Sequence, residues 1–266
     1  MPGWMKPKQR IGFYQNVMQL LERRRIKFLI GGAYALGYYT GLARDTKDFD
    51  LMLRPKDVPS ALRACQNAGY EAKFVFTHWL AKVWSANSFV DIIFRAGNGL
   101  GEVDDVWFSA APAAEIFGIA AKIAPPEELI WQKAFIMERE RFDGADIIHL
   151  LASCATRINW KYLIERFGPD WRVLLSHLIL FGFAFPSKRD LIPTAVIEEL
   201  SARLRKELAE SPLALPLCNG TLLSRLQYLS DITSGGFIDA RTTGRCRIKP
   251  EEIQEWTKAS LQGTAG

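Results

Sequence analysis

Cysteine and histidine are scarce in this chain of 266 residues, which has four cysteines and three histidines. The cysteines, Cys65, Cys154, Cys218 and Cys246, lie far apart and form no C-x-x-C pair. Thiolate zinc sites and redox motifs need closely spaced cysteines, so the sequence argues against both. We expect four reduced thiols, most of them with a structural role.

Long hydrophobic runs are also missing. The longest nearly apolar run, residues 173–185, contains Ser176 and His177 and is shorter than the ~20 residues that a membrane-spanning helix needs. Residues 1–25 are basic, but they lack the unbroken apolar block and the cleavage site of a secretion signal. We therefore expect a cytoplasmic protein that has no membrane partner.

The sequence has no internal repeat and no low-complexity tract, and its composition of 48% hydrophobic and 24% charged residues is typical of globular proteins. Its length predicts one large or two modest domains. Short apolar strands alternate with helices up to Pro125-Pro126, and helical patterns dominate afterwards. We expect an α+β protein, with a mixed β-sheet domain flanked by helices in residues 1–124 and a mainly helical domain in residues 125–266.

Local patterns define the expected elements. Strands are expected at residues 27–30, 49–53, 72–76, 80–84, 89–94 and 116–123. Helices are expected at residues 9–25, 33–42, 58–67, 126–139, 143–155, 159–167, 170–184, 193–209 and 221–230. Residues 233–249 are rich in Gly, Thr and Arg, which predicts an irregular basic loop.

Positive charge is concentrated in the first half of the chain. Residues 1–124 contain 16 Lys+Arg and 11 Asp+Glu, whereas residues 125–266 contain 18 of each. A basic half favours an anionic partner such as a nucleotide or a nucleic acid. A solvated basic surface without a partner is the alternative.

Two carboxylates stand two residues apart on one expected strand. Side chains of a strand alternate between its faces, so Asp48 and Asp50 project from one face and Phe49, Leu51 and Leu53 from the other. Two carboxylates that lie so close repel each other unless a cation lies between them. Mg²⁺, which prefers oxygen ligands, meets this requirement.

A third carboxylate, Asp91, lies inside the apolar strand at residues 89–94 and needs a partner if it is buried. If the two strands are neighbours, three acids converge, and such a site holds the two metal ions that support phosphoryl transfer. The turn at Gly31-Gly32 precedes an expected helix. Glycines let backbone N–H groups approach a phosphate, and the helix N-terminus adds positive potential.

Each of these patterns alone is common: most isolated D-x-D pairs are surface residues, and most Gly-Gly pairs are turns. Their combination resembles the nucleotidyltransferase superfamily with the DNA polymerase beta-type fold. The resemblance implies that Asp48, Asp50 and Asp91 bind two catalytic Mg²⁺ ions. It also implies that Gly31 and Gly32 contact the triphosphate of a nucleoside triphosphate.

A closer resemblance is carried by residues 44–51, which are similar to the R-x-T-x-D-x-D-L stretch of nucleotidyltransferases related to abortive-infection toxins. It makes Arg44 and Thr46 candidate nucleotide-binding residues. The chain departs from the wider superfamily at Ala33, because many members have a serine near the second glycine. A hydroxyl contact to the phosphate at that point is therefore not expected.

The same family carries a lysine and a later pair of aspartates on helices behind the catalytic domain. Here Lys133 precedes Asp143 and Asp146. The resemblance, which covers roughly residues 27–155, implies that Lys133 holds a nucleotide phosphate as a point charge. A solvated charged helix or an internal ion pair is the structural alternative.

We therefore expect a metal-dependent enzyme that moves a nucleoside monophosphate from a nucleoside triphosphate to an acceptor hydroxyl, with RNA, such as a tRNA end, as the acceptor. The alternatives are a small-molecule nucleotidyltransferase of the aminoglycoside type and a non-catalytic module that binds nucleic acid or a protein partner. A component of a toxin–antitoxin pair is a further alternative.

Overall fold

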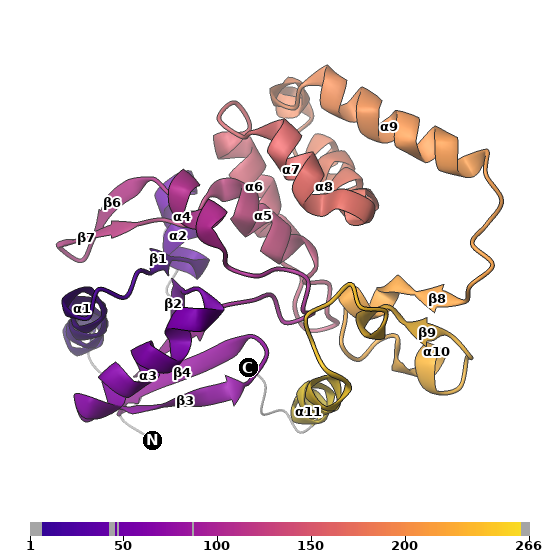
Figure 1. The fold of residues 1–266 in the computed structure, drawn as a ribbon. Coiled ribbons are helices and arrows are strands. Elements are labelled where there is room, and N and C mark those ends of the chain that lie inside the picture. The colour runs from indigo at the N-terminus through magenta and orange to yellow at the C-terminus, as the bar shows by residue number, and fades with distance from the viewer. Residues whose placement is uncertain (1–6, 43–45, 47, 87, 262–266) are drawn as a thin grey trace. The chain divides into compact units, whose positions relative to one another are not determined.

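The computed structural model describes residues 7–42, 46, 48–86 and 88–261. The chain divides into two compact units, Met1–Pro125 and Pro126–Gly266. The first unit contains a mixed five-stranded sheet and the second contains mostly helices (Figure 1). This confirms the predicted α+β class.

The sheet of the first unit has the strand order β1-β2-β5-β4-β3. Its strands are β1 Leu29–Ile30, β2 Asp48–Met52, β3 Glu71–Phe76, β4 Leu80–Ser85 and β5 Ser88–Ile93. The helices of this unit are α1 Pro7–Arg23, α2 Gly32–Thr40, α3 Val58–Asn67 and α4 Asp105–Ala110. The central pair, β2 and β5, is parallel, and the other pairs are antiparallel.

One face of the sheet is buried in the hydrophobic core. Alternate residues of β2, β5 and β4 are fully buried there, namely Phe49, Leu51, Val90, Ile92, Ala81 and Val83. Tyr14 of α1 stacks on Phe49 with 4.7 Å between ring centroids, and Tyr34 of α2 meets the same ring edge-on at 5.2 Å. Because side chains alternate along a strand, the polar residues of β2 and β5 project from the opposite face.

A hairpin replaces the single strand expected at residues 116–123, so that prediction was wrong. Its strands are β6 Ala113–Ile116 and β7 Ile119–Lys122. Phe117 and Gly118 between them have φ values of +54° and +75°, the conformation of a tight hairpin turn with two left-handed residues. The Phe117 ring packs 5.2 Å from Tyr34, and this core contact compensates for an unfavourable backbone conformation.

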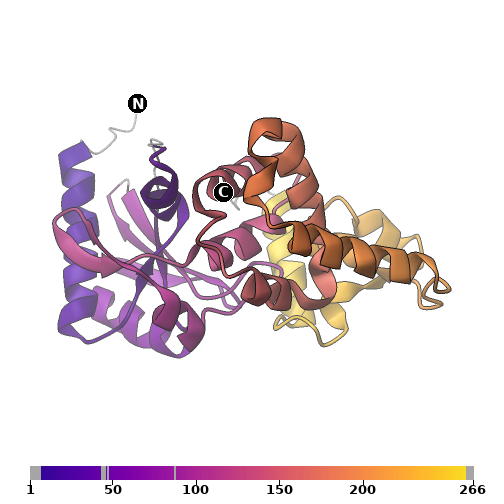
Figure 2. The same ribbon diagram turned by 90° about the horizontal axis from the view of Figure 1, so that it is seen from above.

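The helices of the second unit are α5 Pro126–Ala134, α6 Gly144–Cys154, α7 Trp160–Phe167, α8 Trp171–Ala184, α9 Thr194–Leu208, α10 Leu229–Thr233 and α11 Pro250–Leu261. Those from α5 to α9 follow the expected boundaries closely, although α5 ends earlier than expected, and α11 was not predicted. After α9 the chain runs as an extended segment to β8 Leu217–Cys218, which pairs with β9 Ile238–Asp239 (Figure 1, Figure 2). No helix in the described ranges is long and apolar enough to span a bilayer.

The prediction of a helix at residues 221–230 was wrong. A short 3₁₀ turn, Asn219–Leu222, stands there instead, and Ser224 Oγ accepts a hydrogen bond from Gln227 N at 3.2 Å. Hydroxyl side chains that bind nearby backbone groups compete with helix formation.

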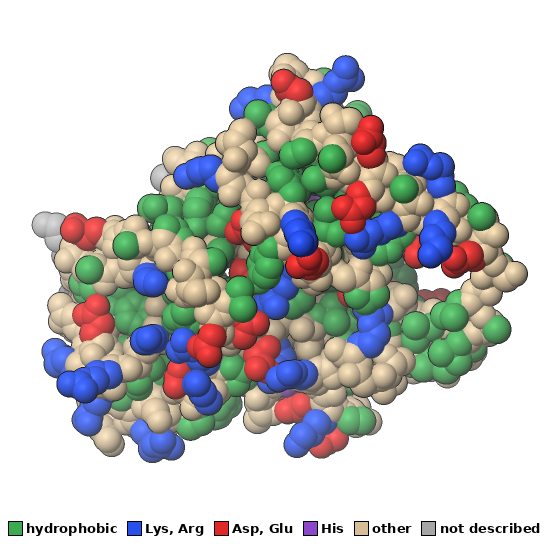
Figure 3. Space-filling view, turned by 45° about the horizontal axis from the view of Figure 1, so that its top comes forward, with side chains coloured by type: hydrophobic (Ala, Val, Ile, Leu, Met, Phe, Trp, Pro, Cys, Tyr) green, Lys and Arg blue, Asp and Glu red, His purple; other side chains and the backbone are tan. Residues whose placement is uncertain are grey.

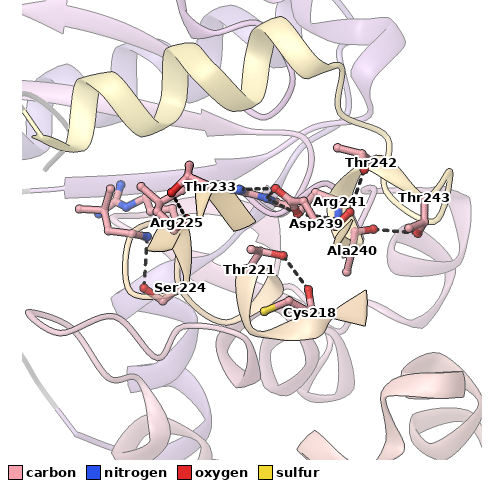
Figure 4. A network of polar contacts seen from close by, with 12 residues as sticks. Cys218, Thr221, Ser224, Arg225, Thr233, Asp239, Ala240, Arg241, Thr242 and Thr243 are labelled. Atoms are coloured by element: carbon pink, nitrogen blue, oxygen red, sulfur yellow. Dashed lines mark hydrogen bonds and ion pairs between the residues drawn. The ribbon is translucent and has the colours of Figure 1, made fainter. Parts of the chain in front are cut away.

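The irregular basic loop expected at residues 233–249 is partly ordered by a buried ion pair. Figure 4 shows the Arg241 guanidinium on the Asp239 carboxylate, with Nη2 at 2.7 Å from Oδ2. Arg241 is only 1% exposed. This arginine therefore stabilises the fold of the loop and does not add to the positive surface.

Candidate active site

The parallel register of β2 and β5 brings the predicted acids together. Asp50 lies directly opposite Asp91, and Asp48 lies opposite Phe89. Neighbouring strands are about 4.8 Å apart, and register partners project from the same face. All three acids therefore share one face of the sheet, opposite the face that is buried in the hydrophobic core. Asp48 and Asp50 are half-buried, and Asp91 is 9% exposed.

The Gly31-Gly32 turn lies against these acids. Gly31 N donates a hydrogen bond to the Asp50 carbonyl oxygen at 2.9 Å, which extends the pairing of β1 with β2. Gly32 has a φ of +52°, and a Cβ there would stand 1.6 Å from Asp50 Oδ2. Only glycine fits this close approach. The structure therefore places the first residue of α2 beside the Asp50 carboxylate.

The two candidates from the stretch before β2 have different outcomes. Thr46 Oγ1 accepts a hydrogen bond from Asp48 N and donates one to the Asp48 carbonyl oxygen, both at 3.2 Å. This side chain fixes the start of β2, and a contact between Thr46 and a nucleotide stays a prediction. Arg44 lies outside the described residues.

Sequence reasoning missed Lys82, the register partner of Asp91 on β4. The Lys82 Nζ atom lies 3.1 Å from Asp91 Oδ1 and 3.5 Å from Oδ2, and 3.9 Å from the centroid of the Phe89 ring. Lys82 is only 9% exposed. The signal was present in the sequence, because a charged residue inside an apolar strand needs a partner, as Asp91 does.

The surroundings of Asp91 favour its neutral form. Burial raises the pKa of Asp91 to about 7, and the charges of Asp50 and Asp48 add to this effect, while Lys82 opposes it. Asp91 Oδ1 is buried, and the Lys82 ammonium is too poorly aligned with it to make a hydrogen bond. A buried carboxylate oxygen without a hydrogen bond is rare in folded proteins and calls for a partner.

The donor set fits a hard divalent cation. Three carboxylates on one face supply the oxygen ligands that Mg²⁺ prefers, and Asp91 Oδ1 has unused capacity. Within the described part of the chain, no three Asp, Glu, His or Cys side chains are gathered tightly enough to ligate one ion as they stand. Their assignment as metal ligands therefore stays a prediction.

Lys133 lies on α5 of the second unit, inside an ion-pair network. Its Nζ atom is 2.8 Å from both Asp143 Oδ2 and Asp146 Oδ2, and Arg141 forms two further hydrogen bonds with Asp143. Burial alone would raise the pKa of Asp143, but the bonds and charges of Arg141 and Lys133 outweigh it and lower that pKa to about 2. This is the internal ion pair considered above, and a phosphate-binding role for Lys133 stays a prediction.

No protein-family model matches the chain, and no curated protein matches it either. Several solved structures are similar. The solution structure of the antibiotic-resistance factor ANT(2'')-Ia is 15% identical, with a TM-score of 0.46, and the match covers 65% of this chain and 98% of that one. A nucleotidyltransferase-like protein from Paracoccidioides brasiliensis is 16% identical, with a TM-score of 0.46, and the match covers 71% and 97%.

The lincosamide antibiotic adenylyltransferase LnuA, solved with lincomycin bound, is a third similar structure. It is 14% identical, with a TM-score of 0.39, and the match covers 55% of this chain and 96% of that one. Of these three structures, one is described as an adenylyltransferase and one as nucleotidyltransferase-like. At TM-scores below 0.5 the similarity says nothing about the substrate of this chain, and the relation to abortive-infection toxins stays a prediction.

Proposed function

We propose that the chain is a metal-dependent nucleotidyltransferase, which moves a nucleoside monophosphate from a nucleoside triphosphate to an acceptor hydroxyl. The observation that carries the proposal is the register that sets Asp50 opposite Asp91, on the face from which Asp48 also projects. The contact of Gly32 with Asp50 supports it, because it joins a candidate phosphate-binding turn to the acids.

In the proposed reaction the acceptor oxygen attacks the α-phosphorus, and the bond between the α-phosphorus and the bridging oxygen to the β-phosphate breaks. Pyrophosphate leaves, and the hydroxyl proton passes to Asp91. Bound Mg²⁺, for which two ions are expected on Asp48, Asp50 and Asp91, would supply charge stabilisation for the phosphates.

Backbone and side chains of this chain would do the positioning. The backbone at Gly32 and the start of α2 would hold the phosphates, while Gly31, whose N–H is bonded to the Asp50 carbonyl oxygen, would shape the turn. Arg44 and Thr46 are proposed to contact the nucleotide as well. Correct placement of the reacting atoms and neutralisation of charge account for most of the rate in such a transfer.

The net charge of the first 124 residues favours an RNA acceptor over a small molecule. Positive and negative side chains are interspersed on the face shown in Figure 3, so this support is weaker than a continuous basic surface would give. A small hydroxylated acceptor is the alternative. Ionic strength separates the two, because transfer to RNA declines steeply as salt rises and transfer to a small molecule declines much less.

The test incubates the protein with each of four α-labelled nucleoside triphosphates, Mg²⁺ and total cellular RNA or a panel of hydroxylated small molecules. We expect label in an acceptor, and at least a thousandfold loss in the variant Asp48→Asn/Asp50→Asn with unchanged circular dichroism. Asp190→Asn, at an exposed position of the second unit, is the matched control. Undiminished transfer by the double variant would refute the assignment, and Mg²⁺-independent nucleic-acid binding without transfer would favour the non-catalytic module.

A further inference from the structure

We propose that Lys82 is a built-in counter-ion of the acidic face, which occupies Asp91 until a divalent cation displaces it. The inference rests on the proposed function and adds a competition that controls metal loading of the same site. It concerns a residue that no part of the proposed reaction uses.

The position of Lys82 supports a role at the site. β4 pairs with β5 in a register that sets Lys82 opposite Asp91, just as β2 sets Asp50 opposite Asp91. The Asp91 carboxylate therefore stands between a lysine on one side and an aspartate on the other. Among the described residues, the polar partner of the Lys82 ammonium is Asp91.

The geometry differs from that of a permanent ion pair. The Lys82 ammonium lies 3.1 Å and 3.5 Å from the two Asp91 oxygens, and Oδ1 has no aligned hydrogen bond. In the second unit, Lys133 makes two hydrogen bonds of 2.8 Å to two carboxylates. A buried pair without good geometry and additional hydrogen bonds does not recover the free energy of desolvation, so the Lys82 contact is the more easily exchanged.

The Lys82 ammonium also contacts the Phe89 ring, and it can keep this contact after it is displaced from Asp91. Lys82 Nζ lies 3.9 Å from the ring centroid, within the range of a cation–π interaction. A cation on Asp91 would leave Lys82 beside the acids with its charge unpaired, where it attracts the phosphates of a nucleotide. Metal binding and nucleotide binding therefore support each other, since each takes up a charge that the other leaves unpaired.

The test measures Mn²⁺ binding to the purified full chain by electron paramagnetic resonance, at pH 8 and without nucleotide. Replacing the ammonium in Lys82→Met removes the competitor, and we expect Mn²⁺ to bind about tenfold more tightly, the lower end of the effect that an adjacent charge has on a carboxylate. The gain should vanish when Asp91→Asn is combined with Lys82→Met, as in a double-mutant cycle. Lys73→Met is the matched control, because Lys73 is the register partner of Lys82 on β3 but pairs with exposed Glu71.

Lys82→Arg keeps the charge, and its fork matches a carboxylate better, so we expect it to bind Mn²⁺ more weakly than the wild type. It also serves as the measurement if circular dichroism shows that Lys82→Met does not fold. Unchanged or weaker binding by folded Lys82→Met, or a gain that persists without Asp91, overturns the inference. If the inference about Lys82 is overturned but the wild type still binds Mn²⁺ through Asp48 and Asp50, the proposed function is unaffected. If neither the wild type nor any variant binds Mn²⁺, the inference and the proposed function are both contradicted.

Discussion

Each unit contains a buried aspartate paired with a lysine, and the two pairs behave in opposite ways. Asp91 and Asp143 are 9% and 8% exposed, yet the pKa of Asp91 is raised to about 7 and that of Asp143 is lowered to about 2. Burial pushes both values upward. The difference arises because Asp143 receives aligned hydrogen bonds from Lys133 and Arg141, whereas Asp91 has one poorly aligned lysine and two negative neighbours.

The comparison shows that burial alone does not distinguish a structural charge from a functional one. The Asp143 network is complete, and its charges are matched by cations of the same unit. The acidic face of the sheet has more negative than positive side chains among Asp48, Asp50, Asp91 and Lys82. An imbalance of this kind is typical of sites that bind a cation or carry out acid–base chemistry.

The largest effect on stability is expected in the ion-pair network around Asp143. Lys133→Met leaves Asp143 and Asp146 without their shared cation, and we expect the free energy of unfolding of the second unit to fall by roughly 3–5 kcal/mol. Lys82→Met should cost much less, because the Lys82 ammonium makes only one poorly aligned contact with Asp91. Urea unfolding of both variants measures the difference, and equal losses would contradict the distinction between the two pairs.

The next effect concerns the contact between the glycine turn and the acids. Gly32→Ala forces a Cβ into Asp50 Oδ2, and a displacement of about 1 Å at a reacting centre lowers turnover roughly a hundredfold. Gly41→Ala is the control: Gly41 also has a positive φ, of +71°, but a Cβ there meets nothing within 4 Å. Similar activities of the two variants in the labelling assay would show that the close approach is irrelevant to transfer.

The pH dependence of stability should have opposite signs at the two aspartates. The folded-state pKa of Asp143 is lowered from 3.8 to about 2, so its contribution of about 2 kcal/mol is present above pH 4 and is lost as the pH falls toward 2. The folded-state pKa of Asp91 is raised from 3.8 to about 7, so metal-free protein loses stability as the pH rises from about 4 to 7.

Urea unfolding in a chelating buffer from pH 2 to 8 measures both slopes. Asp143→Asn should flatten the acidic slope, and Asp91→Asn should flatten the slope toward neutral pH. If Asp91→Asn leaves the neutral slope intact, the elevated pKa of Asp91 is wrong.

The smallest effect is expected at an exposed pair. Lys73 and Glu71 lie 2.7 Å apart, but both side chains are 63% exposed. Exposed ion pairs contribute little, so Lys73→Met should change the free energy of unfolding by less than about 0.5 kcal/mol. A larger loss, seen in the same urea series, would mean that the polar face stabilises the sheet beyond its buried pair.

The sequence was informative wherever a pattern is local. The alternation in Asp48–Met52 predicted which side chains share a face, and the burial of Phe49 and Leu51 agrees with it. Periodicity also predicted most elements up to α9, but it missed α4 and, further along the chain, β8, β9 and α11. Boundaries failed where one or two residues decide the conformation, as at Phe117, where a bulky side chain adopts a positive φ that its residue type does not suggest.

The candidate site was harder to predict because it depends on strand order. Only the parallel pairing of β2 with β5 sets Asp50 beside Asp91, and only the pairing of β4 with β5 brings Lys82 to that carboxylate. Register between strands that are distant in sequence is set by the whole sheet, so one sequence does not reveal it. Lys133 differs, because its partners Asp143 and Asp146 lie close to it in the sequence, and an internal ion pair was one of the two interpretations given for it.

The parallel pairing of β2 with β5 also has a consequence for synthesis. Parallel neighbours need a long crossover, and here it comprises α3, β3 and β4. A nascent chain that has emerged only as far as β4 carries two of the three acids and no opposite strand to complete them. The candidate site therefore forms only after β5 has left the ribosome and inserted at the middle of the sheet.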